Sequence, residues 1–306
     1  MSSPEDRPRA RRKLSGRAPG EPRRVAYLYI LPALAFYLLF TLFPLGQTVK
    51  LSLYAWDGVS QREYIGFANY RELFGDERIR AGFGHALQLV LFFSVLSIVL
   101  GLFLTALLTR FPVRGLTFFR TVLFMPQTIA TVVVAQAFVW WYAPEGPLNE
   151  FLRAIGLSGY AHTWIGDFDW ALRAVGAIGT WVTFGLCMVL FLAGAQRIDG
   201  SLYEAARVDG AGAVREFFAV TLPGLRNELV VAATLTTITA LRSFDLIYNT
   251  TSGGPAGETE VPSWLMFYNA FDLPHRVGYA AAIATMLTLT ISAVALVLGR
   301  LSRAGE

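Results

Sequence analysis

Two charged residues, Arg242 and Asp245, follow an uncharged run, residues 229–241. In a helix that rises 1.5 Å per residue, Arg242 would lie about 20 Å along this segment, beyond the midplane of a hydrocarbon core about 30 Å thick. Charges at that depth usually face a bundle interior or a wet cavity. Their spacing of three residues would place both side chains on one helix face, where they can pair.

The polar groups near this pair suit a polyhydroxylated solute better than an apolar one. Hydroxyl, amide and aromatic groups follow Arg242 closely, and further candidates lie on other apolar stretches, where Thr and Trp also serve in helix packing. A structural ion pair, or an Arg242 side chain that snorkels toward the outer surface, is the alternative. The predicted substrate pathway consists of Arg242, Ser243, Asp245, Tyr248, Asn249, Gln127 and Trp181.

The sequence contains no residue pattern that is typical of a catalytic site or a metal site. The single cysteine, Cys187, excludes a disulfide scaffold and a cysteine-based metal site. The histidines lack metal-ligand spacing; they are His85, His162 and His275. We therefore predict no catalytic residue, no metal site and no cofactor in this chain.

An ATP site of the usual kind is also missing. A Walker A motif needs a lysine directly after a glycine, because that lysine reaches the β- and γ-phosphates. The two lysines, Lys13 and Lys50, do not follow glycines. An active transporter built on this chain would use an ATPase that binds ATP and magnesium in a separate subunit.

The stretch from Asp199 to Pro223 has the pattern of two short helices. Ser201 followed three residues later by Glu204 is a capping box, which predicts a helix that starts at Ser201. Gly210 is placed to end that helix in the left-handed conformation. A second amphipathic helix is predicted over 213–220, and Pro223 would break it.

These two helices allow two interpretations. The loop can pack on the surface of its own membrane domain, or it can dock a cytoplasmic partner. The first helix has one face of mostly small residues, which permits close approach by another surface. That face consists of Leu202, Ala205, Ala206 and Asp209.

The composition places these segments in a polytopic, all-α membrane protein. The chain has 306 residues, of which 54% are hydrophobic and 16% charged, against about 25% charged residues in soluble domains. A bilayer span needs about 20 apolar residues in a helix, and alternating strands of a transmembrane barrel are absent. Six spans are predicted: 26–48, 86–109, 121–142, 174–195, 229–248 and 277–299.

The distribution of basic residues predicts that both termini are cytoplasmic. With that orientation, 17 of the 26 Lys and Arg residues lie inside and eight lie outside, as the positive-inside rule requires. We divide the chain into a basic, disordered cytoplasmic tail, 1–24, and a six-helix transmembrane domain, 25–306, with a cytoplasmic loop at 197–228. The tail suits anionic lipid rather than nucleic acid.

The spacing in the cytoplasmic loop resembles a known signature. Glu204-Ala205-Ala206, then Gly210, then Val220 and Leu222-Pro223 resemble the EAA loop of inner-membrane permease subunits of binding-protein-dependent ABC importers, with valine where isoleucine is frequent. Other segments resemble the carbohydrate-uptake branch, which includes maltose-type and glycerol-3-phosphate-type permeases. Those segments are 66–70, 191–196, 243–248, 251–255 and 278–282.

The resemblance implies a type I ABC importer permease fold and a non-catalytic transport role. Residues 201–209 would form a coupling helix in a groove of the ATP-binding subunit, and ATP-driven closure of that subunit would switch the spans between inward- and outward-facing states. The implied docking residues are Ser201, Leu202, Tyr203, Glu204, Ala205, Ala206, Asp209 and Gly210.

The resemblance also implies partners and a location. The chain would pair with a second permease subunit, two ATP-binding subunits and an extracytoplasmic solute-binding protein, which the outer loop 249–276 could meet. The location would be the cytoplasmic membrane of a prokaryote, and the cargo a sugar or related solute. The alternatives are a stand-alone secondary carrier or channel for a small polar solute, and a membrane scaffold that only recruits a soluble protein.

Overall fold

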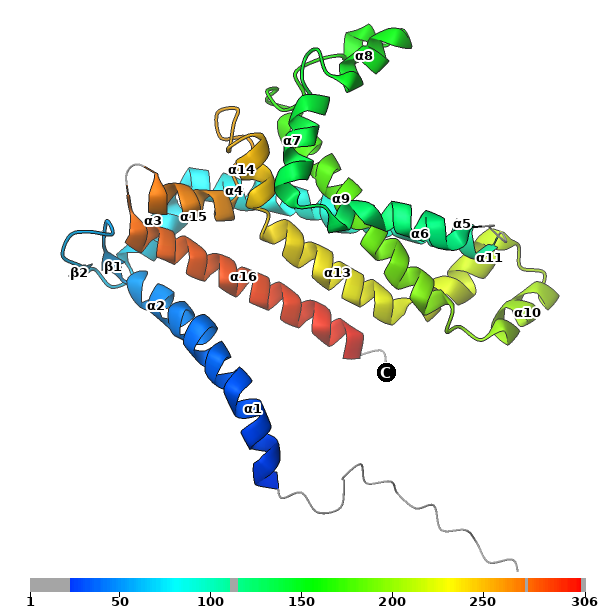
Figure 1. Cartoon of the computed structure of the whole chain (residues 1–306), viewed down its shortest axis with the longest axis horizontal. Helices are drawn as coiled ribbons and strands as arrows, with labels where there is room; N and C mark the ends of the chain where they lie inside the picture. The colour runs from blue at the N-terminus through cyan, green and yellow to red at the C-terminus, as the bar shows by residue number, and fades with distance from the viewer. Residues whose placement is uncertain (1–22, 111–114, 273–274, 304–306) are drawn as a thin grey trace, which may run out of the picture. The chain divides into compact units, whose positions relative to one another are not determined.

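A computed structural model describes residues 23–110, 115–272 and 275–303 (Figure 1). The chain divides into two units, Met1–Gln47 and Thr48–Glu306, which are described separately. Almost all of the predicted basic tail lies outside the described residues.

The first unit contains one long apolar helical run. It consists of α1 (Arg23–Tyr37), a π-helical turn η1 (Leu38–Leu42) and the start of α2 (Phe43–Leu51), which continues into the second unit. Residues 27–51 are long and apolar enough to cross a bilayer. The prediction of an apolar helical span in this region is confirmed.

The second unit begins with a short β-hairpin and a second long helix. A hairpin of β1 (Tyr54–Ala55) and β2 (Glu63–Tyr64) precedes α3 (Ala68–Gly75). The long helix comprises α4 (Glu77–Val90), a π-helical turn η2 (Leu91–Leu96) and α5 (Ser97–Arg110). Residues 77–109 are long and apolar enough to cross a bilayer.

The predicted third span, 121–142, is wrong as a single straight helix. Instead α6 (Leu116–Phe124) continues through the 3-10 turn η3 (Met125–Thr128) and then bends by 95° into α7 (Thr131–Trp141). Pro126 in η3 has no backbone N–H to donate, and Ile129 takes an extended conformation. The bend therefore exposes a stretch of irregular backbone between two apolar helices.

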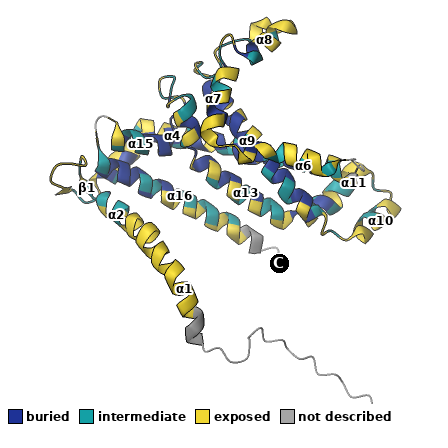
Figure 2. Cartoon of the chain, viewed as in Figure 1, coloured by how far each residue is buried: buried dark blue, intermediate teal, exposed yellow. Residues whose placement is uncertain are grey.

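A segment with α8 (Pro147–Ala154) and η4 (Ser158–Tyr160) leads to α9 (Ala171–Ala195), the best-buried helix among the described residues. Its packing against α5 and η2 depends on small residues. A methyl group on Gly101 would lie 2.7 Å from Cys187 Cβ, so the two helices approach more closely than larger side chains would allow. Figure 2 shows the buried residues gathered along α9 and the helices around it.

The loop between α9 and α13, predicted to be cytoplasmic, is helical as predicted, with shifted boundaries. It comprises α10 (Gly200–Val208), α11 (Ala213–Glu216), η5 (Phe217–Thr221) and α12 (Leu222–Gly224). Pro223 lies inside the helical run that α11, η5 and α12 form without a gap. The run ends at Gly224, with Leu225 as its C-cap, later than the predicted break.

The predicted fifth span, 229–248, is also interrupted. α13 (Arg226–Leu241) ends before Arg242, and α14 (Asp245–Thr250) begins three residues later. After the outer loop come α15 (Pro262–Phe271) and α16 (Val277–Arg303). The described part of the chain thus has four helices that could cross a membrane, or five if the bent α6–α7 pair counts as one span.

Candidate functional site

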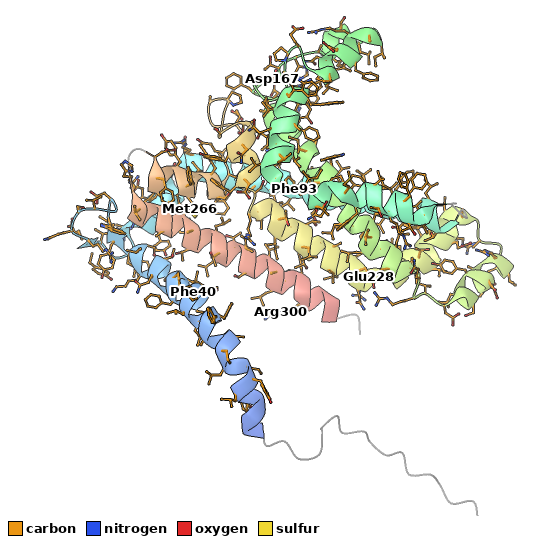
Figure 3. The ribbon with its side chains drawn as sticks, in the orientation of Figure 1. Phe40, Phe93, Asp167, Glu228, Met266 and Arg300 are labelled. Carbon is orange, nitrogen blue, oxygen red and sulfur yellow. The ribbon has the colours of Figure 1, made fainter. Side chains whose placement is uncertain are left out.

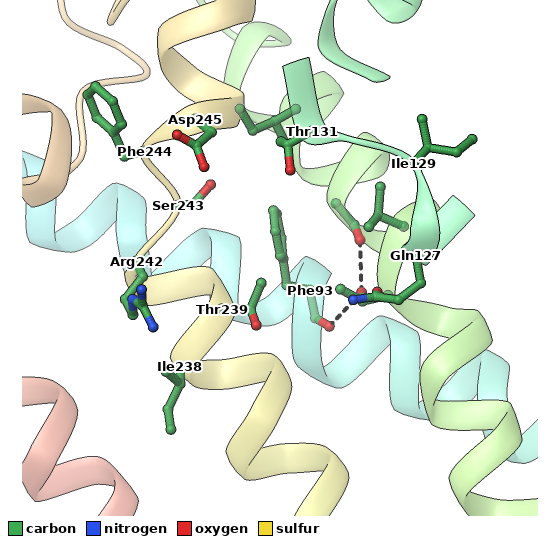
Figure 4. A pocket seen from close by; sticks show the side chains of 14 residues that line it. Phe93, Gln127, Ile129, Thr131, Ile238, Thr239, Arg242, Ser243, Phe244 and Asp245 are labelled. Carbon is green, nitrogen blue, oxygen red and sulfur yellow. Dashed lines mark hydrogen bonds between the residues drawn. The ribbon is translucent and has the colours of Figure 1, made fainter. Parts of the chain in front are cut away.

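A cavity of about 260 Å³ lies where the helices are irregular. It lies between the α13–α14 break, the η3–α7 bend and the π-helical turn η2 (Figure 4). Irregular backbone at membrane depth is tolerated where it is buried in protein or lines a cavity. The lining residues that carry polar side chains are Gln127, Thr131, Thr183, Thr239, Arg242, Ser243 and Asp245.

Four of the predicted pathway residues meet in this cavity. Ser243 and Asp245 lie on one side of it with Arg242, and Gln127 faces them from η3 (Figure 4). Gln127 is more than a hundred positions from the other three residues in the chain, so its position opposite them follows from the fold. The cavity therefore combines a guanidinium, a carboxylate, an amide and several hydroxyls in an otherwise apolar surrounding.

The prediction that Arg242 and Asp245 share one helix face is wrong. The helix stops at Leu241, so the pair flanks a break. Among the described residues, neither the Arg242 guanidinium nor the Asp245 carboxylate makes an ion pair. Both charged groups therefore remain available to a solute.

The remaining predicted pathway residues lie outside the cavity lining. Asn249 donates from Nδ2 to the Asp245 carbonyl oxygen at 2.7 Å, and its own carbonyl oxygen accepts from Gln136 Nε2 at 3.0 Å. Trp181 packs edge-on against Phe138 with ring centroids 5.4 Å apart. Tyr248 packs against the ring of the lining residue Phe244, with centroids 5.3 Å apart. In this structure, Asn249 and Trp181 serve to hold helices together.

Sequence reasoning missed Phe93, Thr131 and Thr239 as cavity residues. Phe93 lies in the π-helical turn near the junction of α7, α9 and α13 (Figure 3). Its carbonyl oxygen accepts a 3.1 Å hydrogen bond from Thr183 Oγ1. A hydropathy pattern gives no sign of such a turn, because every residue in η2 except Ser94 is apolar.

Hydroxyl groups from α9 compensate for the irregular hydrogen bonding of η2. Thr180 Oγ1 donates to the Phe92 carbonyl oxygen at 3.0 Å, and Ser97 Oγ lies 2.7 Å from Thr183 Oγ1. Thr236 Oγ1 of α13 donates to Ser94 Oγ at 2.9 Å. In a bilayer each unsatisfied backbone group is costly, so these contacts fix the wall of the cavity that Phe93 forms.

The loop from α10 to α12 presents a second candidate surface. α10 has no buried residue, and Gly210 has the predicted left-handed conformation, with φ of 74°. Several apolar side chains of the loop are exposed, including Leu202, Val214 and Phe218. An exposed apolar surface of this kind is typical of a protein–protein contact.

The helix cap of α10 differs from the prediction. Asp199, and not Ser201, is the N-cap, and its Oδ1 accepts a 3.0 Å hydrogen bond from the Ser201 backbone N–H. This hydrogen bond lowers the pKa of Asp199. The carboxylate also lies at the positive end of the helix dipole, which favours its charged form.

Internal contacts hold the loop in one arrangement. Arg207 binds Glu216 through two hydrogen bonds of 3.2 Å, which join α10 to α11. Tyr203 Oη lies 3.2 Å from Thr221 Oγ1. The Glu204 carboxylate, by contrast, makes no ion pair or side-chain hydrogen bond with another described residue. Glu204 is therefore free to contact a partner.

We expect Asp199→Ala to loosen the first turn of α10. The loss of an N-cap should raise the rate of amide exchange in that turn about two- to tenfold, measured by hydrogen–deuterium exchange on the purified protein. Asp199→Asn retains a capping oxygen and should leave exchange close to wild type. Equal protection in the alanine variant would contradict this role.

The same cap has a defined pH dependence. Because the pKa of Asp199 is lowered in the folded state, its stabilising effect is fully present above the unfolded carboxyl pKa of about 4. The effect is lost as the pH falls through the lower, folded-state pKa. The protection of the first turn should therefore not change between pH 5 and pH 8.

The sequence of the chain matches a known protein family and individual relatives. The family described as binding-protein-dependent transport system inner membrane component matches residues 97–304. A probable ABC transporter permease protein, YurN of Bacillus subtilis, is 38% identical over 289 residues, covering 92% of this chain and 97% of that protein. The trehalose/maltose transport system permease protein MalF of Thermococcus litoralis is 33% identical, with coverage of 92% and 95%.

A solved structure agrees with the fold. One chain of a bacterial ABC transporter involved in the import of the acidic polysaccharide alginate superposes with a TM-score of 0.76 at 23% identity. The alignment covers 92% of this chain and 96% of that chain.

Proposed function

Because the chain belongs to the family of binding-protein-dependent transport system inner membrane components, we propose that it is the permease subunit of an ATP-driven importer that carries a sugar or related polyhydroxylated solute. The sugar-transport permease among its relatives supports this class of cargo. The chain acts as a non-catalytic membrane component, and a separate subunit binds and hydrolyses ATP.

The observation that carries the proposal is the cavity at the α13–α14 break. Its unpaired Arg242 and Asp245, together with Ser243, Gln127 and threonine hydroxyls, offer both donors and acceptors to a solute with many hydroxyl groups. Phe93 supplies an apolar wall. This combination of a few polar groups on an apolar lining is typical of small-molecule sites.

The ATP-binding subunit would act on the membrane helices through α10. Its exposed surface and the unpaired Glu204 suit a groove in an ATP-binding subunit, and the Arg207–Glu216 pair would keep α10 and α11 moving together. The docking set is Ser201, Leu202, Tyr203, Glu204, Ala205, Ala206, Asp209 and Gly210. Closure of the ATP-binding subunits would thereby switch the cavity between the two sides of the membrane.

The proposed topology has six membrane crossings and cytoplasmic termini. The bent α6–α7 pair would form one crossing, and α13 with α14 would form another despite the break. The excess of basic residues on the α10 side supports this orientation. A second permease subunit, two ATP-binding subunits and an extracytoplasmic solute-binding protein would complete the importer.

Reconstitution tests the proposed function. The chain, its partner permease, the ATP-binding subunits and the solute-binding protein are placed in liposomes, and uptake of labelled maltose, trehalose and lactose is measured. We expect import of at least one sugar only with ATP and the complete set. Solute flux through the chain alone would identify a carrier or channel and overturn the proposal.

The role of the cavity has its own test. We expect Asp245→Asn and Arg242→Gln to raise the KM for sugar import about ten- to a hundredfold, because a hydrogen bond to a charged group contributes about 1.5–3 kcal/mol. Asp169→Asn, an exposed acid in the segment between α8 and α9, is the matched control and should import like wild type. If both cavity variants keep the wild-type KM, the cavity does not bind the solute.

A further inference from the structure

Four aromatic rings form a continuous row that starts at the cavity. The rings are Phe244, Tyr248, Phe267 and Phe271, hereafter the aromatic row. The centroid of Phe267 lies 5.1 Å from Phe244, 5.3 Å from Tyr248 and 5.2 Å from Phe271. The row thus extends from Phe244, at the start of α14, to Phe271, the last residue of α15.

One end of the row lines the cavity and the other end is exposed. Phe244 is a lining residue at the helix break. Tyr248 is 43% exposed and Phe271 is 68% exposed. The Tyr248 hydroxyl has no hydrogen-bond partner within the described part of the chain. The structure therefore leaves two rings, Tyr248 and Phe271, accessible beside the cavity-lining Phe244.

A rigid layer supports the row from behind. Trp264 is buried and lies nearly parallel to both Phe244 and Phe267, with interplanar angles of 19° and 30°. Ser263 Oγ donates to the Ser243 carbonyl oxygen at 3.2 Å, which ties the first turn of α15 to the helix break itself. The row and the cavity wall are consequently parts of one fixed structure.

An ion pair between the half-exposed Arg78 of α4 and the buried Glu260 holds the chain just before α15. Arg78 binds both carboxylate oxygens of Glu260, which is 7% exposed, and its guanidinium lies 4.7 Å from the centre of the Tyr268 ring. His85 Nδ1 lies 2.8 Å from the Glu260 carbonyl oxygen. These contacts hold the aromatic row in place without covering its exposed faces.

We propose that the aromatic row is an outer binding subsite for pyranose rings, which it passes to the cavity at the α13–α14 break. The inference rests on the proposed function and specifies the solute: a sugar with flat C–H faces, rather than an open-chain polyol. The electron-rich face of an aromatic ring attracts partially positive C–H groups. Successive rings at similar spacing let a sugar move along the row without leaving an attractive surface.

Phe271 provides the test, because it is the most exposed ring of the row. In the reconstituted importer, Phe271→Leu keeps an apolar side chain but removes the aromatic face, whereas Phe271→Tyr restores it. We expect the leucine variant to raise the KM for maltose or trehalose about three- to tenfold, as the loss of one aromatic contact implies. The tyrosine variant should return the KM to within about twofold of wild type.

The matched control is Phe118→Leu. Phe118 is also 68% exposed, but it lies on α6, outside the row. We expect its KM to equal that of the wild type. A structural role of Phe271 would lower the amount of folded protein or the maximal rate, without a specific rise in KM and without rescue by tyrosine.

Thiol labelling gives a readout that does not depend on transport. The single natural cysteine, Cys187, is buried, so Phe271→Cys introduces one accessible thiol. We expect a water-soluble methanethiosulfonate reagent to label it in the assembled importer, and saturating maltose or trehalose to slow that labelling. A thiol that reacts only with lipid-soluble reagents, or that the second permease subunit covers, would overturn the inference.

These outcomes distinguish a failure of the proposed function from a failure of the aromatic subsite alone. If the wild-type importer takes up none of the sugars, the proposed function fails and the inference fails with it. If the wild type imports sugar but Phe271→Leu keeps its KM and the Phe271→Cys thiol is not protected by sugar, only the inference fails.

Discussion

Glu204→Ala is expected to reduce ATP-driven sugar uptake at least tenfold in the reconstituted importer. The Glu204 carboxylate is exposed on α10 and has no ion-pair partner within the described residues. If it pairs with a basic group in the ATP-binding subunit, its truncation leaves that group unpaired at a buried interface, which costs about 2–5 kcal/mol. The loss should appear as weaker binding of the ATP-binding subunit and as ATP hydrolysis uncoupled from transport.

Two controls make this result specific to docking. Asp169→Ala removes an exposed acid from the segment between α8 and α9, apart from α10 in the chain, and should leave uptake near wild type. Glu204→Gln keeps the shape but not the charge and should fall between the two. Wild-type uptake and subunit binding in Glu204→Ala would show that this carboxylate has no part in coupling.

Gly185→Ala is expected to have the largest effect on stability. A Cβ atom at Gly185 would overlap the backbone carbonyl oxygen of Leu123, and the backbone of α6 cannot rotate away as a side chain can. Added atoms in a packed interior typically cost about 1–3 kcal/mol, and sometimes more. We expect a lower melting temperature for the detergent-purified protein, with reduced yield of folded monodisperse material.

The matched control is Gly84→Ala. Gly84 lies in α4, and a Cβ atom there meets nothing within 4 Å. Alanine in a helix interior is favoured over glycine by about 0.5–1 kcal/mol, so this variant should melt at or slightly above the wild-type temperature. If Gly185→Ala melts like Gly84→Ala, then α6 and α9 do not pack as closely as the structure indicates.

A comparable clash involves the cavity itself. A Cβ atom at Gly179 would overlap the Phe93 ring, and both residues line the cavity. A substitution here would push an aromatic side chain that can rotate, where Gly185 faces rigid backbone. Of the two glycines, Gly179 is therefore the one that links helix packing directly to the shape of the solute site.

The class of protein and the helical form of the stretch from Asp199 to Pro223 follow from the sequence. Hydropathy predicted helical apolar segments, because a bilayer requires long runs without charge. The loop pattern from Glu204 to Pro223 predicted two short helices joined at Gly210, since capping and left-handed glycine are local effects. These predictions depend only on residues that lie close together in the sequence.

The positions of the helix breaks, and the residues that meet at these breaks, depend on tertiary packing. A hydropathy window averages over Pro126 and over residues 242–244, so it predicted continuous spans where the structure has a 95° bend and an interruption. The cavity, the hydroxyl contacts of η2 and the aromatic row join residues that are distant in the chain. Such contacts depend on how α9, α13 and α15 pack, and packing is set by shape complementarity between segments.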